Sequence, residues 1–202
     1  MNNTITTSTA TGSWVRRTLR WMATFTGFPL GGLAAWLIVG PVDSIGTAVL
    51  GGLITGGILG AVQAIGLGRL GGFTPAWVGA TAVGMATGLG IGSAVVGYGT
   101  SLSDLAMQGA ISGLVVGIGQ ALVLRNGVSE PRLGALTLAW PPFLAASWAV
   151  GWTITTLGGI GVEDQFTVFG SFGAITVAAL TAVLPFALAR IPVHTSTEKS
   201  HS

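Results

Sequence analysis

Cysteine is absent from this chain of 202 residues, and charged residues are scarce. The chain holds 8 Lys and Arg and 6 Asp and Glu, so 7% of its residues are charged, against about 25% in typical soluble domains. Without cysteine it can form no disulfide, thiolate nucleophile or Cys-ligated metal site. Because a soluble protein of this size needs many polar groups to cover its surface, the lack of charge argues against an ordinary soluble enzyme.

Apolar residues and glycine are abundant in place of charged residues. Half of the chain is hydrophobic, and 34 residues are glycine. The glycines follow no strict three-residue period, which excludes collagen, and the hydrophobicity excludes simple disorder. The eight basic residues form no patch with interleaved aromatics, so no nucleic-acid partner is expected. The remaining class is an all-α, polytopic integral membrane protein in contact with the lipid bilayer.

Apolar runs long enough to cross about 30 Å of hydrocarbon predict six transmembrane helices. A disordered cytoplasmic segment, 1–20, and a disordered cytoplasmic tail, 191–202, would flank the transmembrane domain, 21–190. The predicted spans are Met22–Val39, Ile45–Leu67, Ala76–Val96, Leu105–Leu124, Leu133–Thr156 and Phe166–Ala189.

The distribution of charge predicts the orientation of these spans. In the six-span arrangement all eight basic residues fall on one side of the membrane, and four of the six acids (Asp43, Asp104, Glu163 and Asp164) fall on the other. The positive-inside rule then places both termini in the cytoplasm and the protein in the inner membrane of the cell. The first span could also be read as a cleaved signal peptide, but its length and the lack of a small-residue cleavage site favour a membrane anchor.

An internal repeat links the second and fourth spans. Each contains three glycines at four-residue spacing followed by Gln-Ala, and all five positions match at an offset of 57 residues. The repeating unit is predicted to be a helical hairpin, present three times and packed in glycine-zipper fashion, with a pseudo-threefold arrangement possible. The third copy is the weakest: Gly170, Ala174, Ala178 and Ala182 keep the small-residue spacing, but the Gln is missing.

Glycines four residues apart line one helix face and let two backbones approach closely in lipid. The main interpretation is packing within one chain; an oligomer interface and a pore lined by backbone carbonyls are alternatives. The predicted helix-packing residues are Gly52, Gly56, Gly60, Gly84, Gly88, Gly92, Gly109, Gly113 and Gly117.

Groups for chemistry are missing from the predicted membrane interior. The six spans contain no Asp, Glu, Lys, Arg or His, and both histidines lie in the tail. Ionisable residues inside a bilayer are the usual sign of a proton relay, ion path or catalytic centre. We therefore expect no enzyme, no catalytic residue, no cofactor and no metal site.

Two glutamines are the best candidates for a polar site inside the membrane. Gln63 and Gln120 sit one helical turn or more inside their cytoplasmic arginines. Each needs a hydrogen-bond partner in hydrocarbon, such as the other glutamine, a Thr hydroxyl or a carbonyl freed by proline. The structural interpretation is a clamp between repeats. The functional alternative is a cytoplasm-facing vestibule for a small polar solute or a lipid headgroup.

The seven tryptophans divide by predicted depth. Trp14, Trp21, Trp77 and Trp152 lie near predicted interfaces and are typical of an aromatic belt. The deeper residues Trp36, Trp140 and Trp148 are predicted to pack inside, and Gln108 is predicted to be interfacial.

The repeated GxxxGxxQ pattern with a following Leu and Arg, as in Gly113, Gly117, Gln120, Leu124 and Arg125, resembles uncharacterised multi-pass bacterial membrane proteins built from such hairpins. The resemblance covers mainly spans two to five and implies architecture but no activity. The leading functional hypothesis is a non-enzymatic membrane component that packs with itself or with other membrane proteins. The alternative is a small-solute transporter or channel without buried ionisable coupling residues.

Overall fold

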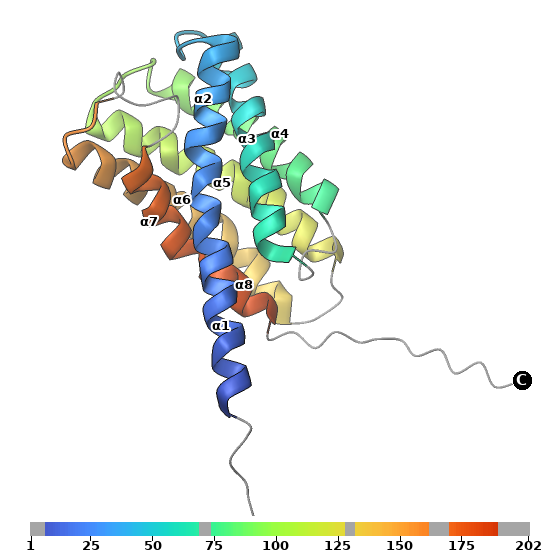
Figure 1. Ribbon diagram of the computed structural model, residues 1–202. Helices are drawn as coiled ribbons and strands as arrows, with labels where there is room; N and C mark the ends of the chain where they lie inside the picture. Colours follow the sequence, from blue (N-terminus) through green and yellow to red (C-terminus); the bar gives the residue numbers. More distant parts are fainter. Residues whose placement is uncertain (1–6, 69–73, 128–131, 162–169, 190–202) are drawn as a thin grey trace, which may run out of the picture.

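The structure is a computed structural model that describes residues 7–68, 74–127, 132–161 and 170–189. Every regular element in these ranges is helical (Figure 1). The elements are α1 (Thr7–Met22), the short 3-10 helix η1 (Ala23–Thr26), α2 (Gly27–Val39), α3 (Ile45–Leu67), α4 (Thr74–Val95), α5 (Leu102–Gly127), α6 (Arg132–Leu157), α7 (Ser171–Thr181) and α8 (Val183–Ala189).

The helices form a bundle in which successive segments run up and down beside one another (Figure 1). Along the bundle, α2 packs on α3, α3 on α4, α4 on α5, α5 on α6 and α6 on α7. Helix α7 also contacts α1, η1 and α2, so the last long segment lies against the first.

Five segments of the described chain are long and apolar enough to cross a membrane, namely 14–39, 45–67, 75–95, 102–126 and 171–189. Helix α6 has a similar length, 26 residues, and contains Pro141 and Pro142. The predicted all-α class is confirmed for the described residues, and several of the helices are apolar and long enough for a multi-pass membrane protein.

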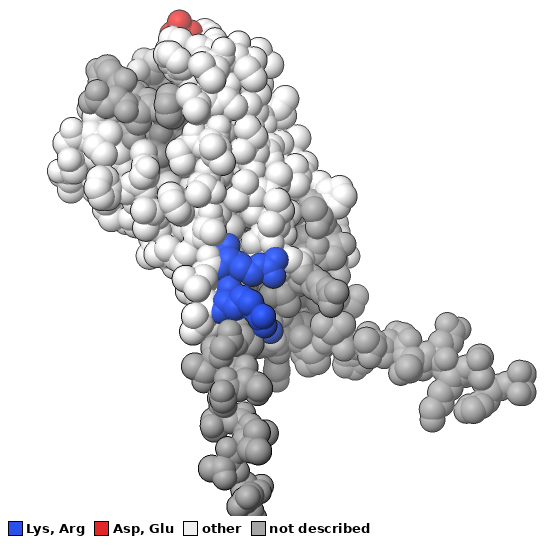
Figure 2. All heavy atoms as spheres, viewed as in Figure 1, with Lys and Arg blue, Asp and Glu red and all other residues white. Residues whose placement is uncertain are grey.

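The outer surface is apolar between two charged ends. Figure 2 shows Lys and Arg gathered at the end where α1 begins and Asp or Glu at the opposite end, with an uncharged surface between them. Large apolar side chains point outward on several helices: Leu138 is 81% exposed and Ile65 is 72% exposed. A surface of this kind is costly in water but suits contact with lipid chains.

Local sequence explains where the helices begin and end. Ser44 caps α3 with its side chain and forms a capping box with Thr47, and Gly68 ends the same helix with a φ of 56° that favours glycine. At the start of α5, the Asp104 carboxylate accepts hydrogen bonds from the backbone N–H and the hydroxyl of Ser101. The capping residues therefore lie at the two ends of the bundle: Ser44 and Asp104 near the acidic end, and Gly68 near the basic end.

Prolines coincide with two interruptions. Pro29 cannot donate to the carbonyl of Phe25, and the chain forms η1 at this point, between α1 and α2. Pro185 cannot donate to the carbonyl of Thr181, where α7 ends before α8. Pro141 and Pro142, in contrast, lie inside α6, which continues through them.

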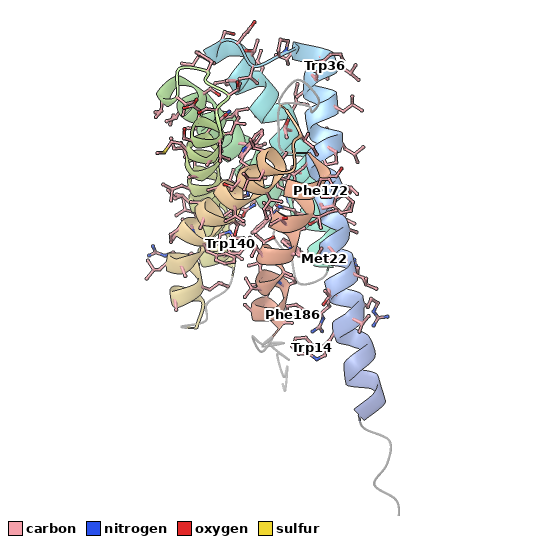
Figure 3. The ribbon with its side chains drawn as sticks, turned by 90° about the vertical axis from the view of Figure 1, so that its left-hand side faces the viewer. Trp14, Met22, Trp36, Trp140, Phe172 and Phe186 are labelled. Carbon is pink, nitrogen blue, oxygen red and sulfur yellow. The ribbon has the colours of Figure 1, made fainter. Side chains whose placement is uncertain are left out.

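One predicted boundary needs correction. The predicted disordered segment 1–20 differs from the structure, in which α1 begins at Thr7 and continues the first apolar segment toward the basic end. Its last turns are held by packing, since Trp14 stacks on Phe186 of α8 with ring centroids 5.1 Å apart (Figure 3). The last predicted span, Phe166–Ala189, is helical from Ser171, and Phe166 lies outside the described residues. The predicted tail 191–202, both histidines and the charges Arg69, Glu130, Glu163, Asp164, Arg190, Glu198 and Lys199 also lie outside them.

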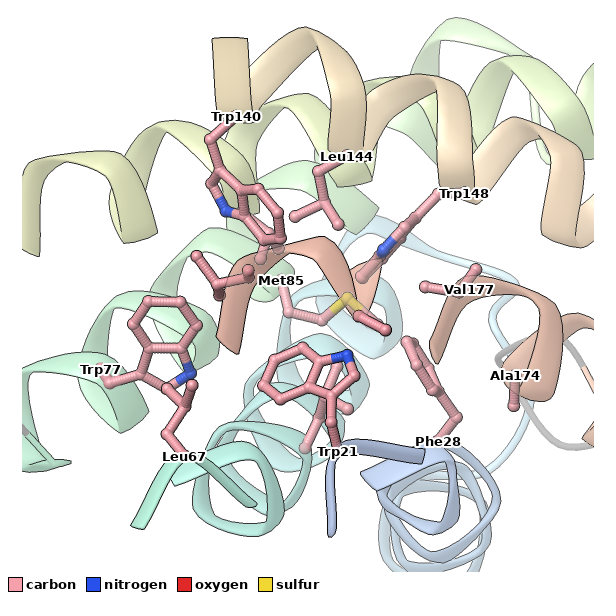
Figure 4. Close-up of a cluster of buried hydrophobic side chains, with 14 of the residues drawn as sticks. Trp21, Phe28, Leu67, Trp77, Met85, Trp140, Leu144, Trp148, Ala174 and Val177 are labelled. Atoms are coloured by element: carbon pink, nitrogen blue, oxygen red, sulfur yellow. The ribbon is translucent and has the colours of Figure 1, made fainter. Parts of the chain in front are cut away.

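The core consists of large side chains from helices far apart in the sequence. Trp21, Trp77, Trp140 and Phe28 are almost completely buried and surround Met85 and Leu144 (Figure 4). Phe28 of α2 contacts Trp148 of α6 edge to face, with centroids 5.5 Å apart. This cluster joins α1 and α2 to α6 and α7.

Candidate functional site

The two glutamines singled out by the repeat meet inside the bundle. Gln63 lies on α3 and Gln120 on α5, and the Gln120 Nε2 donates to the Gln63 Oε1 at 3.2 Å. The two residues therefore bridge two helices that are 57 positions apart in the chain. They lie at the ends of α3 and α5 that face the basic end of the molecule.

Gln120 is buried and fully engaged. Its side chain is 1% exposed. The second N–H of its amide donates to the Thr81 hydroxyl on α4 at 3.0 Å, and its Oε1 accepts from the Trp140 indole on α6 at 2.9 Å. The Thr81 hydroxyl donates in turn to the carbonyl of Trp77 at 2.8 Å. One amide thus connects α3, α4, α5 and α6 and leaves neither of its N–H groups without an acceptor.

Gln63 is half-buried and has a similar partner. Its Oε1 accepts from the Trp77 indole on α4 at 3.1 Å as well as from Gln120. In each case a glutamine on one helix accepts from a tryptophan on the next helix in the chain. An oxygen that accepts two hydrogen bonds has both lone pairs in use.

A third bond of the same kind involves a threonine. The Trp21 indole on α1 donates to the Thr181 hydroxyl on α7 at 3.2 Å, and this hydroxyl donates to the Val177 carbonyl at 2.7 Å. Thr181 was not predicted as a site residue, because the third copy lacks the glutamine of the other two. The signal was present: Thr181 follows Gly170, Ala174 and Ala178 at the spacing with which Gln63 follows Gly52, Gly56 and Gly60.

The glycines of α3 face α4 at very short range. A Cβ added to Gly56 would lie 2.6 Å from the carbonyl oxygen of Thr81, and one added to Gly52 would lie 2.7 Å from that of Met85. A Cβ on Gly60 would lie 3.0 Å from the Cα of Val78. Since real Cβ atoms are not found below 3.0 Å from such atoms, two of these three positions have no space for a side chain.

The glycines of α4 and α5 each face the helix that follows. On α4, added Cβ atoms at Gly84, Gly88 and Gly92 would lie 2.8 Å from the Cα of Val116, 2.7 Å from the Cα of Ser112 and 3.1 Å from the Gln108 carbonyl. On α5, those at Gly113 and Gly117 would lie 2.7 Å from the Leu144 carbonyl and 2.7 Å from the Cα of Pro141, and Gly109 faces Trp148 and Trp152. All nine predicted packing glycines thus face backbone or side chains of the same chain.

A second polar contact lies toward the other end of the bundle. Gln108, predicted to be interfacial, is buried on α5 and donates to the Ser93 hydroxyl on α4 at 3.0 Å. On α3, the Thr55 hydroxyl donates to the Gly31 carbonyl of α2 at 3.2 Å. Buried polar side chains therefore join helices toward both ends of the bundle.

The division of the tryptophans by depth is corrected by the structure. Trp21, Trp77 and Trp152, predicted as belt residues, are buried in the interior, whereas Trp36, predicted to pack inside, is 49% exposed. Figure 3 shows Trp36 pointing away from the bundle and Trp140 lying inside it. Depth along a helix does not determine which face a residue occupies, and indole N–H groups that find an acceptor can be buried.

The chemistry available to this site is that of neutral hydrogen bonding. Its members are carboxamides, indoles and hydroxyls, none of which ionises near neutral pH. Among the residues that the structure describes, no three His, Cys, Asp or Glu are grouped so that they could hold a metal ion. The arrangement positions helices and offers no nucleophile paired with a base.

No protein-family model matches the chain, and neither a curated protein nor a solved structure matches it significantly.

Proposed function

We propose that the chain is a non-enzymatic, multi-pass protein of the inner membrane that acts as an assembly or interaction component through its outer surface. In this proposal α6 crosses the bilayer together with the five apolar segments, which gives six spans and both termini in the cytoplasm. The apolar surface between a basic and an acidic end supports this placement (Figure 2).

The observation that carries the proposal is that the glycine faces and the buried polar groups make their contacts within the chain. The glycine faces are occupied by neighbouring helices of the same chain, and the amide of Gln120 has its partners inside the bundle. Contacts with other molecules are then left to the outer faces and the two ends. This differs from association through the glycine faces, because those faces are already in contact.

Three hairpins arranged around a ring account for the internal bonds. The hairpins would be α1–α2 with α3, α4 with α5, and α6 with α7–α8. In each, a tryptophan of the first arm donates to a polar side chain on the second arm of another hairpin: Trp77 to Gln63, Trp140 to Gln120 and Trp21 to Thr181. The third bond runs from the start of the chain to its end, as closure of a pseudo-threefold ring requires. Thr181 would take the place of the missing glutamine.

No specific observation supports the alternative that the chain is a transporter or channel. A path for a polar solute would need polar groups free to exchange partners, whereas Gln120 donates both its N–H groups to protein acceptors. Three large indoles, those of Trp21, Trp77 and Trp140, are buried in one cluster of side chains. A solute would have to displace these bonds to enter between Gln63 and Gln120.

Purification of the full chain in mild detergent, with mass measurement and identification of co-purifying chains, tests the assembly role. We expect a particle larger than one chain. Single Trp substitutions of the outward residues Leu53, Val83 and Leu138, which are 44%, 61% and 81% exposed, would locate the contact. Bulk on the contacting helix should dissociate the particle, and bulk on the other two should not. A monomer without any co-purifying chain would contradict the assembly role.

A further inference from the structure

A cluster of three arginines on α1 is not used by the interior just described. Arg16, Arg17 and Arg20 lie in the second half of α1, and Figure 2 shows Lys and Arg gathered at the end of the molecule where α1 begins. Arg16 and Arg20 are exposed and lie one turn apart, on one face of the helix. In the described part of the chain the only carboxylates are Asp43 and Asp104, which belong to the opposite end. No described acid therefore balances these three charges.

Arg20 is held in place by the end of a neighbouring helix. Its Nη2 donates to the Ile65 carbonyl on α3 at 3.0 Å, and a Cβ on Gly68 would lie 2.9 Å from the same nitrogen. A positive charge at a helix C-terminus is favourable because the last carbonyls carry partial negative charge. A guanidinium has five N–H donors, so this bond leaves several available.

Exposed apolar side chains border the arginines. Val15 and Leu19 lie one turn apart on the adjoining face of α1 and are 54% and 63% exposed, and Ile65 of α3 is 72% exposed. The same place thus offers cationic donors at the edge of the apolar belt and an apolar surface directly beside them. This combination matches an amphiphile with an anionic head.

We propose that Arg16, Arg17 and Arg20 bind the phosphate of an anionic phospholipid whose acyl chains lie along Leu19 and Ile65. Guanidinium groups bind phosphate through paired N–H donors. A free phosphate would gain nothing from the apolar side chains, which is why the lipid is the occupant. The inference rests on the membrane placement proposed above, but not on association with a protein partner.

Lipid titration of the full chain in detergent, followed by native mass spectrometry, tests this site. The probes are phosphatidylglycerol, phosphatidylcholine and soluble glycerol phosphate. We expect phosphatidylglycerol to bind in preference to phosphatidylcholine. The variant Arg16→Gln with Arg17→Gln keeps the bond from Arg20 to α3 and should bind phosphatidylglycerol about 30-fold more weakly. Tryptophan fluorescence verifies that the variants are folded.

The single variant Arg16→Gln should bind phosphatidylglycerol about five-fold more weakly than the native chain, and Arg125→Gln is its matched control. Arg125 is exposed in the last turn of α5, at the same end of the bundle, and each substitution removes one charge. Arg125→Gln should leave affinity near that of the native chain. Equal loss in the two variants, equal affinity for the two lipids, or competition by glycerol phosphate at lipid-like concentrations would overturn the proposal. Failure of the chain to enter vesicles of either lipid would instead contradict the membrane placement itself.

Discussion

Two kinds of contact hold this bundle together, and they differ in how closely the helices approach. Between α3 and α4, and between α5 and α6, glycine faces bring one backbone directly against the next helix. Between α7 and the segment formed by α1, η1 and α2, the corresponding positions are Ala174 and Ala178, and the helices are short or interrupted. A methyl group holds backbones farther apart than a hydrogen atom does.

The polar bonds differ in the same way. Gln120 makes three hydrogen bonds to three other helices, whereas Thr181 links α7 to α1 through one bond from Trp21. The contact between the ends of the chain is thus the seam of the bundle, defined here as α7 against α1, η1 and α2. The comparison indicates that the seam contributes less to stability than the glycine contacts between α3 and α4 and between α5 and α6.

The largest expected effect comes from filling a glycine contact. Gly56→Leu places a side chain where even a Cβ would lie 2.6 Å from Met85 and Thr81. We expect it to lower the free energy of unfolding by about 3 kcal/mol or to prevent folding. The neighbouring Gly57→Leu is the matched control, because a Cβ there meets nothing within 4 Å. Unfolding followed by tryptophan fluorescence in mixed micelles would measure both, and equal losses would contradict the short approach of α3 and α4.

Removing the central amide should have the next largest effect. Gln120→Leu leaves the buried indole N–H of Trp140 without its acceptor and deprives Gln63 and Thr81 of a donor. We expect a loss of about 2 kcal/mol in the free energy of unfolding. Adding Trp140→Phe removes the orphaned donor, so the double variant should lose less than the sum of the two single variants. Strict additivity would contradict the bond between Trp140 and Gln120.

A substitution at the seam should lower the free energy of unfolding by less. Thr181→Val removes the acceptor of Trp21 while keeping the shape of the side chain, and we expect a loss of about 1 kcal/mol. Thr176→Val on the same helix is the control, because its exposed hydroxyl bonds only to the carbonyl of Phe172. The same unfolding measurement applies. A loss as large as that of Gln120→Leu would show that the seam is not the weaker contact.

The smallest effect is expected at the second polar level. Ser93→Ala removes one acceptor from Gln108 and should lower the free energy of unfolding by about 0.5 kcal/mol. Unfolding of this variant and of Gln120→Leu under the same conditions gives the relative contributions of the two polar contacts to stability. A larger loss in the free energy of unfolding for Ser93→Ala than for Gln120→Leu would show that the main polar contact is the one between Gln108 and Ser93.

Helix ranges could be predicted well where local signals coincide with the apolar run. The predicted span Ile45–Leu67 is the range of α3, because Ser44 caps its start and Gly68 ends it. The fold class followed from composition together with the long apolar runs, both of which a single sequence shows directly. Helix α1 was missed since its polar first turns carry no apolar run, and its order comes from packing such as the Trp14 stack on Phe186.

The candidate site could be predicted only where residue identity repeats. Gln63 and Gln120 were found because both copies carry the same amide, but Thr181 was missed because a hydroxyl performs the corresponding role. Trp21 and Trp77 were placed at the membrane interface because hydropathy reports depth and not the direction of a side chain. Their direction depends on acceptors on other helices, which a single sequence does not reveal.

Cross-linking across the seam tests the central claim that a single chain closes on itself. The chain has no cysteine, so Trp14→Cys with Phe186→Cys introduces the only two thiols, at rings whose centroids lie 5.1 Å apart. With a short bis-maleimide in membranes, we predict a cross-link within one chain, seen as a monomer whose two ends stay joined after cleavage in the segment 128–131. Each single variant should give no such product. Cross-linked dimers without the intrachain product would contradict closure within one chain.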